Sequence, residues 1–224
     1  MTIFMVSTWV TPLLLAITLH EAAHGYVARI CGDDTAWRLG RVTFNPLRHV
    51  DPFGTVLLPA LLLMFHSPFL FGYAKPVPVN FGRLRQPRRD MIWVAAAGPG
   101  MNIALAVAAA LLVHAVGFLP TGAGRWVLAN LVNLITINVF LAVFNMIPLP
   151  PLDGGRVAVG VLPDALAAPL AALEPYGMLI LIGIFFLLPA LEAGTGLHIN
   201  LFAELVTRPS RAVIQIIMRL AGLA

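Results

Sequence analysis

The sequence is poor in charge and in cysteine. Charged residues make up only 11% of the chain, whereas a soluble domain carries about a quarter, and the mean hydropathy is +0.90. So little polar surface excludes a soluble globular protein, and we expect an integral membrane protein. Cys31 is the only cysteine, which excludes an intrachain disulfide and a cysteine-based metal cluster.

The chain also lacks repeats, low-complexity tracts and room for a separate soluble domain. A helix needs about 20 apolar residues to cross a bilayer core of about 30 Å, so 224 residues allow about four to six crossings. We expect one integral membrane domain over residues 1–224, with a core at about 8–160 and C-terminal helices at about 165–224. Met1–Val6 lacks the basic start of a signal peptide, so the first helix should be retained.

Positive charge gathers in two loops. The net charge is +4, and arginines concentrate at 32–50 and 72–90. Short loops rich in arginine and lysine stay on the cytoplasmic side of a membrane, so the apolar run 53–71 between them should be re-entrant rather than spanning. An anionic lipid bilayer accounts for this charge, and we expect no nucleic acid partner. The pattern predicts a multi-pass protein of the cell (plasma) membrane.

Other apolar stretches predict membrane helices, which cover 9–30, 91–119, 126–147 and 176–191. A loop with Pro163 and Pro169 should precede the last of them, and 41–44 has the character of a short strand. The tail at 197–224 spaces arginines among apolar residues, which favours an interfacial amphipathic helix and leaves a further crossing open. The third helix carries several amides that need a polar or buried face, namely Asn130, Asn133, Asn138 and Asn145.

The first apolar helix contains a His-Glu-x-x-His motif, formed by His20, Glu21 and His24. Residues four apart leave the same face of a helix about one turn apart, so both imidazoles can bind one metal ion. Glu21 lies beside that ion without being needed as a ligand, which suits it to take a proton from an activated water. Ionisable groups in a membrane helix are costly without such a purpose. The motif lies toward the end that enters loop 32–50, so the active site should lie nearer the cytoplasmic face.

A third candidate ligand follows the helix at 126–147. Prolines at 148–151 stop this helix and the glycines after Asp153 permit sharp turning, so Asp153 stands at a break in a membrane helix. We expect it to bind the metal; the alternative is an ordinary capping aspartate. Because all three ligands lie toward or beyond the C-terminal ends of their helices, those two helices must run parallel with one crossing between them. That count again makes 53–71 re-entrant.

Three motifs in chain order resemble those of the site-2 protease family of intramembrane zinc metalloproteases: His20-Glu21-x-x-His24, Gly98-Pro99-x-x-Asn102 and Asn145-x-x-Pro148-x-Pro150-Pro151-Leu-Asp153. The likeness covers about 8–160. It implies an all-α polytopic membrane protein, with a three-helix metalloprotease core, a re-entrant segment, a short membrane-associated β element and one or more C-terminal helices. It also implies one zinc ion (Zn2+) per chain, bound by His20, His24 and Asp153, with Glu21 as the general base.

The resemblance further implies an activity and its substrate contacts. The activity is hydrolysis of peptide bonds within or next to transmembrane segments of membrane proteins. Phe71–Val77 resembles the family's edge strand beside the active site, so Gly72, Tyr73 and Ala74 should bind the substrate. Asn102 and Asn145 are the other expected substrate contacts, with Asn145 positioning the substrate or stabilising the oxyanion. The PDZ and CBS domains of many relatives are missing.

A non-enzymatic membrane metal-binding protein or cation transporter could use the same ligands. Such a protein would not need Glu21 as a base, so the set of three ligands and one free glutamate favours the enzyme. His114 and His198 have no partner at a recognisable spacing and should be structural or interfacial, whereas the roles of His49 and His66 stay open. The sequence specifies neither the substrate nor the oligomeric state.

Overall fold

A computed structural model describes residues 3–57, 60–61, 64, 74–184 and 200–223. No strand is assigned within these ranges, and the chain there is mostly helical. The helices are α1 (Ile3–Ile30), α2 (Thr35–Arg38), η1 (Pro46–His49), η2 (Pro52–Leu57), η3 (Phe81–Arg83), α4 (Pro87–Val113), η4 (His114–Phe118), α5 (Thr121–Asn145), α6 (Asp153–Val161), α7 (Asp164–Ala172), η5 (Glu174–Tyr176), α8 (Gly177–Ile182), η7 (Ala203–Thr207) and α10 (Arg208–Leu220).

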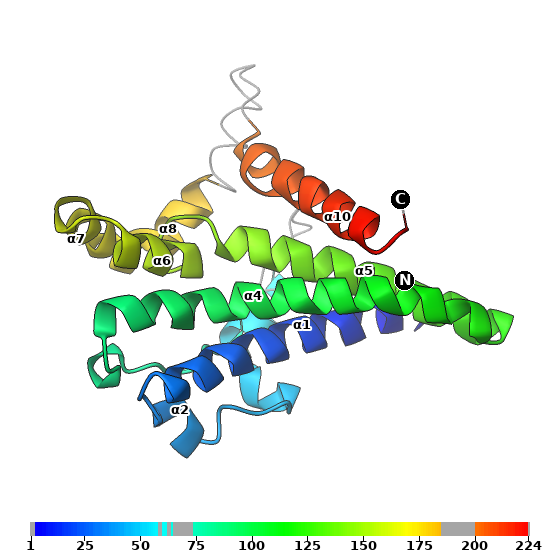
Figure 1. The fold of residues 1–224 in the computed structure, drawn as a ribbon, viewed down its shortest axis with the longest axis horizontal. Coiled ribbons are helices and arrows are strands. Elements are labelled where there is room, and N and C mark those ends of the chain that lie inside the picture. Colours follow the sequence, from blue (N-terminus) through cyan, green and yellow to red (C-terminus); the bar gives the residue numbers. More distant parts are fainter. Residues whose placement is uncertain (1–2, 58–59, 62–63, 65–73, 185–199, 224) are drawn as a thin grey trace.

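Helices α1, α4 and α5 form a three-helix core in which each helix contacts the other two. Helices α1 and α5 run in the same direction and α4 runs against them (Figure 1). This is the parallel arrangement expected if the histidine pair and Asp153 are to meet. Four segments of the described chain are long and apolar enough to cross a membrane: Ile3–Ile30, Pro87–Phe118, Thr121–Asn145 and Asp164–Ile182. The protein is therefore a multi-pass membrane protein.

The three predicted core helices are confirmed, but each begins earlier than expected. Helix α1 begins at Ile3 rather than near Trp9, and α5 begins at Thr121 rather than at Trp126. Helix α4 begins at Pro87, because proline has no N–H to lose in the first turn of a helix. The glycines before Trp126 continue α5, and Gly124 packs close to the Val116 carbonyl across the turn.

The prediction of a loop around Pro163 and Pro169 is wrong, because helices α6 and α7 occupy this part of the chain. Pro163 is the N-cap residue of α7, and Pro169 lies inside this helix without ending it. Proline reads as a stop in sequence, but it is also well placed immediately before a helix. Gly177–Ile182 confirms the start of the next apolar helix; the rest of that prediction, like the start of the tail, falls at 185–199, outside the described residues.

The predicted β structure does not form in the described chain. Residues 42–44 are bends, and 74–80 has no regular secondary structure. Strand character at 41–44 needs a partner strand, but here the Arg41 side chain donates to the carbonyls of Lys75 and Pro76 instead. The segment 65–73 lies outside the described residues, so the re-entrant prediction is not tested; before it, Pro52–Leu57 forms a short helical turn.

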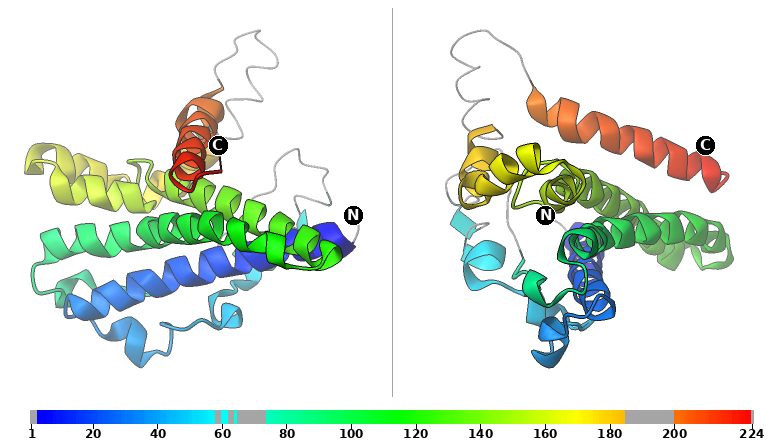
Figure 2. Two further views of the ribbon diagram at one scale, coloured as in Figure 1. Left: turned by 45° about the vertical axis from the view of Figure 1, so that its right-hand side comes forward. Right: turned by 60° about the vertical axis from the view of Figure 1, so that its left-hand side comes forward.

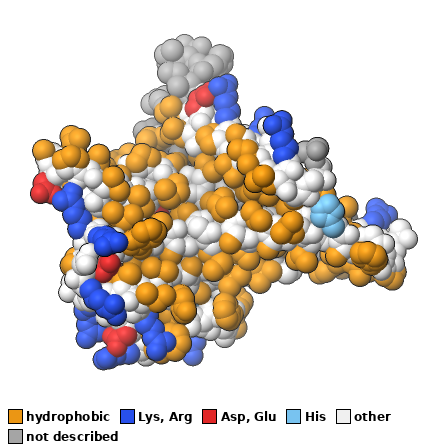
Figure 3. Space-filling view, viewed as in Figure 1, with side chains coloured by type: hydrophobic (Ala, Val, Ile, Leu, Met, Phe, Trp, Pro, Cys, Tyr) orange, Lys and Arg blue, Asp and Glu red, His pale blue; other side chains and the backbone are white. Residues whose placement is uncertain are grey.

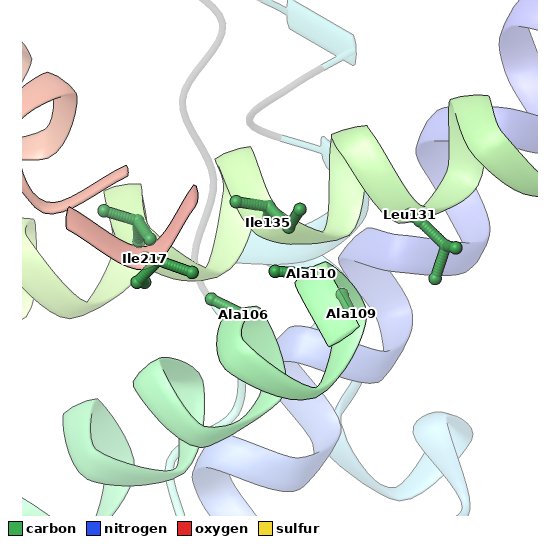
Figure 4. Packing of buried hydrophobic residues seen from close by; sticks show 7 residues of the cluster. Ala106, Ala109, Ala110, Leu131, Ile135 and Ile217 are labelled. Carbon is green, nitrogen blue, oxygen red and sulfur yellow. The ribbon is translucent and has the colours of Figure 1, made fainter. Parts of the chain in front are cut away.

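The C-terminal helix α10 packs on the core across α5, on the side away from α1 (Figures 1 and 2). Its Ile217 inserts where α4 and α5 meet (Figure 4), in a cluster with Ala106, Ala109, Ala110, Leu131, Ile135 and Val139. The small alanines on α4 permit this close approach. The arginines of α10 stay exposed while Ile217 is buried on the core, so an amphipathic helix is present in the tail. Its interfacial position stays a prediction.

Exposed arginines gather at the end of the bundle where α1 leads into α2 and where α4 begins (Figure 3). The buried Asp33 ties these elements together. Its Oδ2 accepts a hydrogen bond from the Asn80 N–H at 2.7 Å, and its Oδ1 accepts one from the Thr35 N–H at 3.0 Å and another from the Thr35 hydroxyl. Burial raises the pKa of the Asp33 carboxyl, but these hydrogen bonds and the charge of Arg83 lower it more, so the net pKa is below its usual range.

We predict that Asp33→Asn removes an acid-sensitive part of the stability. The pKa of Asp33 is lowered on folding, so its contribution is fully present above the unfolded pKa of about 4 and is lost as pH falls through the lower folded value. At neutral pH the variant should lose about 2 kcal/mol of unfolding free energy in detergent, since bonds to a buried carboxylate are lost. Asp34→Asn is the matched control, because the Asp34 carboxylate forms surface ion pairs with Arg38 and Arg83. Parallel losses of stability in the parent and Asp33→Asn on acidification would contradict this role.

Candidate metal centre

The structure brings His20, His24 and Asp153 together. The Nε2 atoms of both histidines lie 3.3 Å from Asp153 Oδ2 and 3.1 Å from each other. The three ligand atoms lie within 4.8 Å of one another. The side chains are only 9%, 12% and 12% exposed. The α1 spacing of four residues accounts for the histidine pair, and the third ligand comes from the first residue of α6.

Asp153 reaches the histidines because the chain turns back tightly after α5. A Cβ on Gly154 would overlap the main chain of Met146, so only glycine allows the start of α6 to fold onto the end of α5. The other end of α6 is held by Arg88 at the start of α4. Its Nε donates to the Gly160 carbonyl at 3.1 Å and its guanidinium also binds the Leu162 carbonyl. Helix α6 is therefore fixed at both ends.

Each histidine is oriented through its second ring nitrogen. His24 Nδ1 donates to the Val94 carbonyl at 2.7 Å, and His20 Nδ1 donates to Asn102 Oδ1 at 2.5 Å. Both partners lie on α4, so this helix acts as the support of the site. With the proton held on Nδ1, the lone pair of each Nε2 atom points at Asp153, which is the tautomer a metal ion needs.

The donor set fits a zinc ion. Asp153 Oδ2 is buried and accepts no hydrogen bond from any side chain or main chain that the structure describes. Two imidazole nitrogens and one carboxylate oxygen are typical zinc ligands, with a fourth position open for water or substrate. A Cβ on Gly98 would overlap the Nε2 atoms of both histidines, so glycine keeps open the space in front of the ligands. His20, His24 and Asp153 could therefore hold Zn2+.

Glu21 lies on the same helix beside the first ligand and is not one of the three converging groups. Its Oε2 accepts a hydrogen bond of 2.8 Å from the Val77 N–H. Val77 is buried against α1, where a Cβ on Gly25 would touch its side chain. The segment 74–80 thus covers the turn of α1 that carries Glu21.

The predicted substrate residues are only partly assembled. Asn102 is fully buried and supports His20, and Asn145 donates to the Leu141 carbonyl one turn back in its own helix. Ala74 is half-buried in the irregular segment 74–80. Gly72 and Tyr73 lie outside the described residues.

Of the remaining four histidines, the structure describes His49 and His114. His114 Nε2 donates to the Ala221 carbonyl at 2.7 Å and so fastens the C-terminal end to the core, a structural role. His49 is buried and its Nε2 donates to the Thr43 carbonyl at 3.1 Å, while its own carbonyl accepts from the Lys75 N–H. His66 and His198 lie outside the described residues.

Two supports of the site were not identified from the sequence. Asn138 on α5 is fully buried and its Oδ1 accepts from Asn102 Nδ2 at 2.7 Å. The only sequence signal was the surplus of amides on an apolar helix. The Val94 carbonyl gave no signal, because every residue has a carbonyl and only the α1–α4 register selects this one.

A sequence model of peptidase family M50 matches residues 8–123 and 121–190. The chain is 36% identical to "Putative zinc metalloprotease YwhC" of Bacillus subtilis, over 88% of this chain and 91% of that protein. It is 30% identical to "Putative zinc metalloprotease Rip2" of Mycolicibacterium smegmatis, over 85% of this chain and 69% of that protein. No solved structure matches the chain. Since the family match covers most of the chain and the Bacillus relative aligns along nearly its whole length, the protein belongs to peptidase family M50, a family of zinc metalloproteases.

Proposed function

We propose that this protein is an intramembrane protease that hydrolyses peptide bonds within or next to transmembrane segments of other membrane proteins. The observation that carries the proposal is the convergence of His20, His24 and Asp153 within an apolar helix bundle, beside a glutamate that does not join them. A soluble substrate would have no reason to enter such a bundle. Membrane protein segments reach it by lateral diffusion in the lipid.

Zinc, when bound, supplies a Lewis acid and lowers the pKa of a bound water toward about 7. In our proposal Glu21 is the general base. Its carboxylate accepts a proton from the attacking water as the new C–O bond forms at the scissile carbonyl. It then passes that proton to the leaving nitrogen as the C–N bond breaks. The Val77 N–H binds Oε2, so Oε1 is the oxygen that we assign to proton transfer.

The substrate must present an extended backbone, since a helix hides its carbonyls in its own hydrogen bonds. Strand addition beside the active site would hold it extended. Within 74–80 the N–H groups of Lys75, Val77 and Asn80 are donated inside the chain, and Pro76 and Pro78 have none. We therefore assign substrate pairing to Gly72, Tyr73 and Ala74, and the proline-containing part to the support of Glu21.

We further propose that the active site faces the cytoplasmic side of the plasma membrane and that 53–71 is re-entrant. The arginine-rich loops at both flanks of this run support the orientation. Asn145, at the end of α5, would contact the substrate or its oxyanion once the amide leaves the Leu141 carbonyl. We assign no such rearrangement to Asn102, because its amide oxygen contacts His20.

We predict that Glu21→Gln retains zinc but loses cleavage by about 100-fold or more, because a general base contributes about 100- to 10,000-fold. Asp153→Ala should lose zinc as well as activity. The measurement is zinc content by mass spectrometry and cleavage of a model transmembrane substrate in detergent. Glu174→Gln is the matched control, since Glu174 pairs with Arg156 on the surface. Full cleavage by Glu21→Gln would rule out this base, and absence of zinc from the parent would rule out the proposed site.

We also predict that Gly98→Ala lowers the affinity for zinc by about 10-fold or more, as loss of an outer support of a metal site does. The added methyl group would overlap both Nε2 atoms, so His20 and His24 would have to shift. Gly100→Ala is the control, because a Cβ there meets no atom within 4 Å. Chelator competition gives the affinity. Equal zinc binding by the two variants would show that the space at Gly98 is not part of the site.

A further inference from the structure

Three hydrogen bonds in a row connect the proposed metal ligand His20 to the backbone of α5. His20 Nδ1 contacts Asn102 Oδ1 at 2.5 Å, and Asn102 Nδ2 donates to Asn138 Oδ1 at 2.7 Å. Asn138 Nδ2 donates to the Leu134 carbonyl at 2.8 Å. Both asparagines are fully buried, so no solvent competes for these bonds.

The two histidines depend on different kinds of partner. The Val94 carbonyl beside His24 can only accept, so His24 must carry its proton on Nδ1. Asn102 presents an amide, whose oxygen and nitrogen ends have nearly the same shape. With the oxygen toward His20, the proton stays on Nδ1 and the Nε2 lone pair is free for a metal ion. With the nitrogen toward His20, the proton would move to Nε2 and the ligand would be lost.

The orientation of Asn102 is fixed from its far side. Its Nδ2 has two acceptors, Asn138 Oδ1 at 2.7 Å and the Ala16 carbonyl at the longer distance of 3.3 Å. A reversed Asn102 would bring its oxygen against both of these oxygens in a dry interior, which is unfavourable. Asn138 is the nearer and therefore the stronger of the two constraints.

Asn138 is itself an amide that could turn, and a backbone carbonyl prevents it. The Leu134 carbonyl can only accept, so it binds Nδ2 and directs Oδ1 of Asn138 toward Asn102. We propose that Asn138 is a positioning residue for the metal site: it transmits the polarity of a backbone carbonyl through Asn102 and so sets the tautomer of His20. The inference rests on the zinc site proposed above.

Asn133 offers a matched comparison on the same helix. Its Nδ2 donates to the Thr8 carbonyl at 2.8 Å, so it also joins α5 to α1 by an amide–carbonyl bond. That bond does not lead to His20. If Asn138 served only to hold the helices together, loss of either amide would have the same effect on the metal site.

The test compares Asn138→Leu, Asn138→Asp and Asn133→Leu in the full-length protein in detergent. Zinc affinity is measured by chelator competition, and the His20 tautomer by NMR of isotope-labelled histidine nitrogens in the metal-free protein, assigned with His20→Asn. We expect Asn138→Leu to bind zinc about 10-fold or more weakly, in line with losses on removing outer supports of metal sites. The proton of His20 should then be shared between Nδ1 and Nε2.

Asn138→Asp should restore both properties toward the parent. The introduced carboxyl group, kept protonated by burial, can donate to the Leu134 carbonyl and accept from Asn102. Asn133→Leu should leave the tautomer and the zinc affinity unchanged. The proposal is overturned if Asn138→Leu keeps the Nδ1 proton and parental zinc affinity, if Asn138→Asp is as impaired as Asn138→Leu, or if Asn133→Leu is equally impaired. A parent without zinc would overturn the proposed function alone, since the tautomer is read in the metal-free protein.

Discussion

Two imidazole nitrogens and one carboxylate oxygen converge on one place inside the helix bundle, and the rest of the structure depends on this arrangement. Three such groups in an apolar bundle repel one another unless a cation joins them. In the proposed zinc site, metal binding would therefore be coupled to the assembly of α1 with α5 and α6. The same requirement explains why α1 and α5 run parallel and why α5 is broken before Asp153.

The central helix α4 orients the two histidines. It supplies the Val94 carbonyl and the Asn102 amide as acceptors, and at Gly98 it leaves the space in front of the histidines empty of side chain. Between membrane helices there is little hydrophobic driving force, so close packing at small residues and hydrogen bonds decide the register. In this protein both kinds of contact act on the same turns of α4, and a shift in its register would disturb both histidines at once.

The sequence was sufficient to predict those parts of the site that depend on local chain geometry. The four-residue spacing of His20 and His24 on a helix fixes their common face, and a break after an apolar helix marks Asp153. It was insufficient where a partner is chosen by tertiary packing. Within the described residues, 41–44 has no strand to pair with. The prolines at 163 and 169 stand at the start of α7 and within it, and this helix packs on α6. The contact of Asn102 with His20 was not predicted, because nothing in its own motif reveals that the packing of α1 on α4 brings the two side chains together.

The segment 74–80 contacts Glu21 directly, through the Val77 N–H. The chain here holds its own backbone against the protein at Lys75, Val77 and Asn80, and one of these bonds ends on the Glu21 carboxylate. Prolines at the intervening positions remove the donors that would otherwise invite a second strand. Under the proposed function, a peptide that paired at Gly72 and Tyr73 would act on the same backbone whose Val77 N–H binds the Glu21 carboxylate. Substrate binding and the orientation of the proposed base would then be linked.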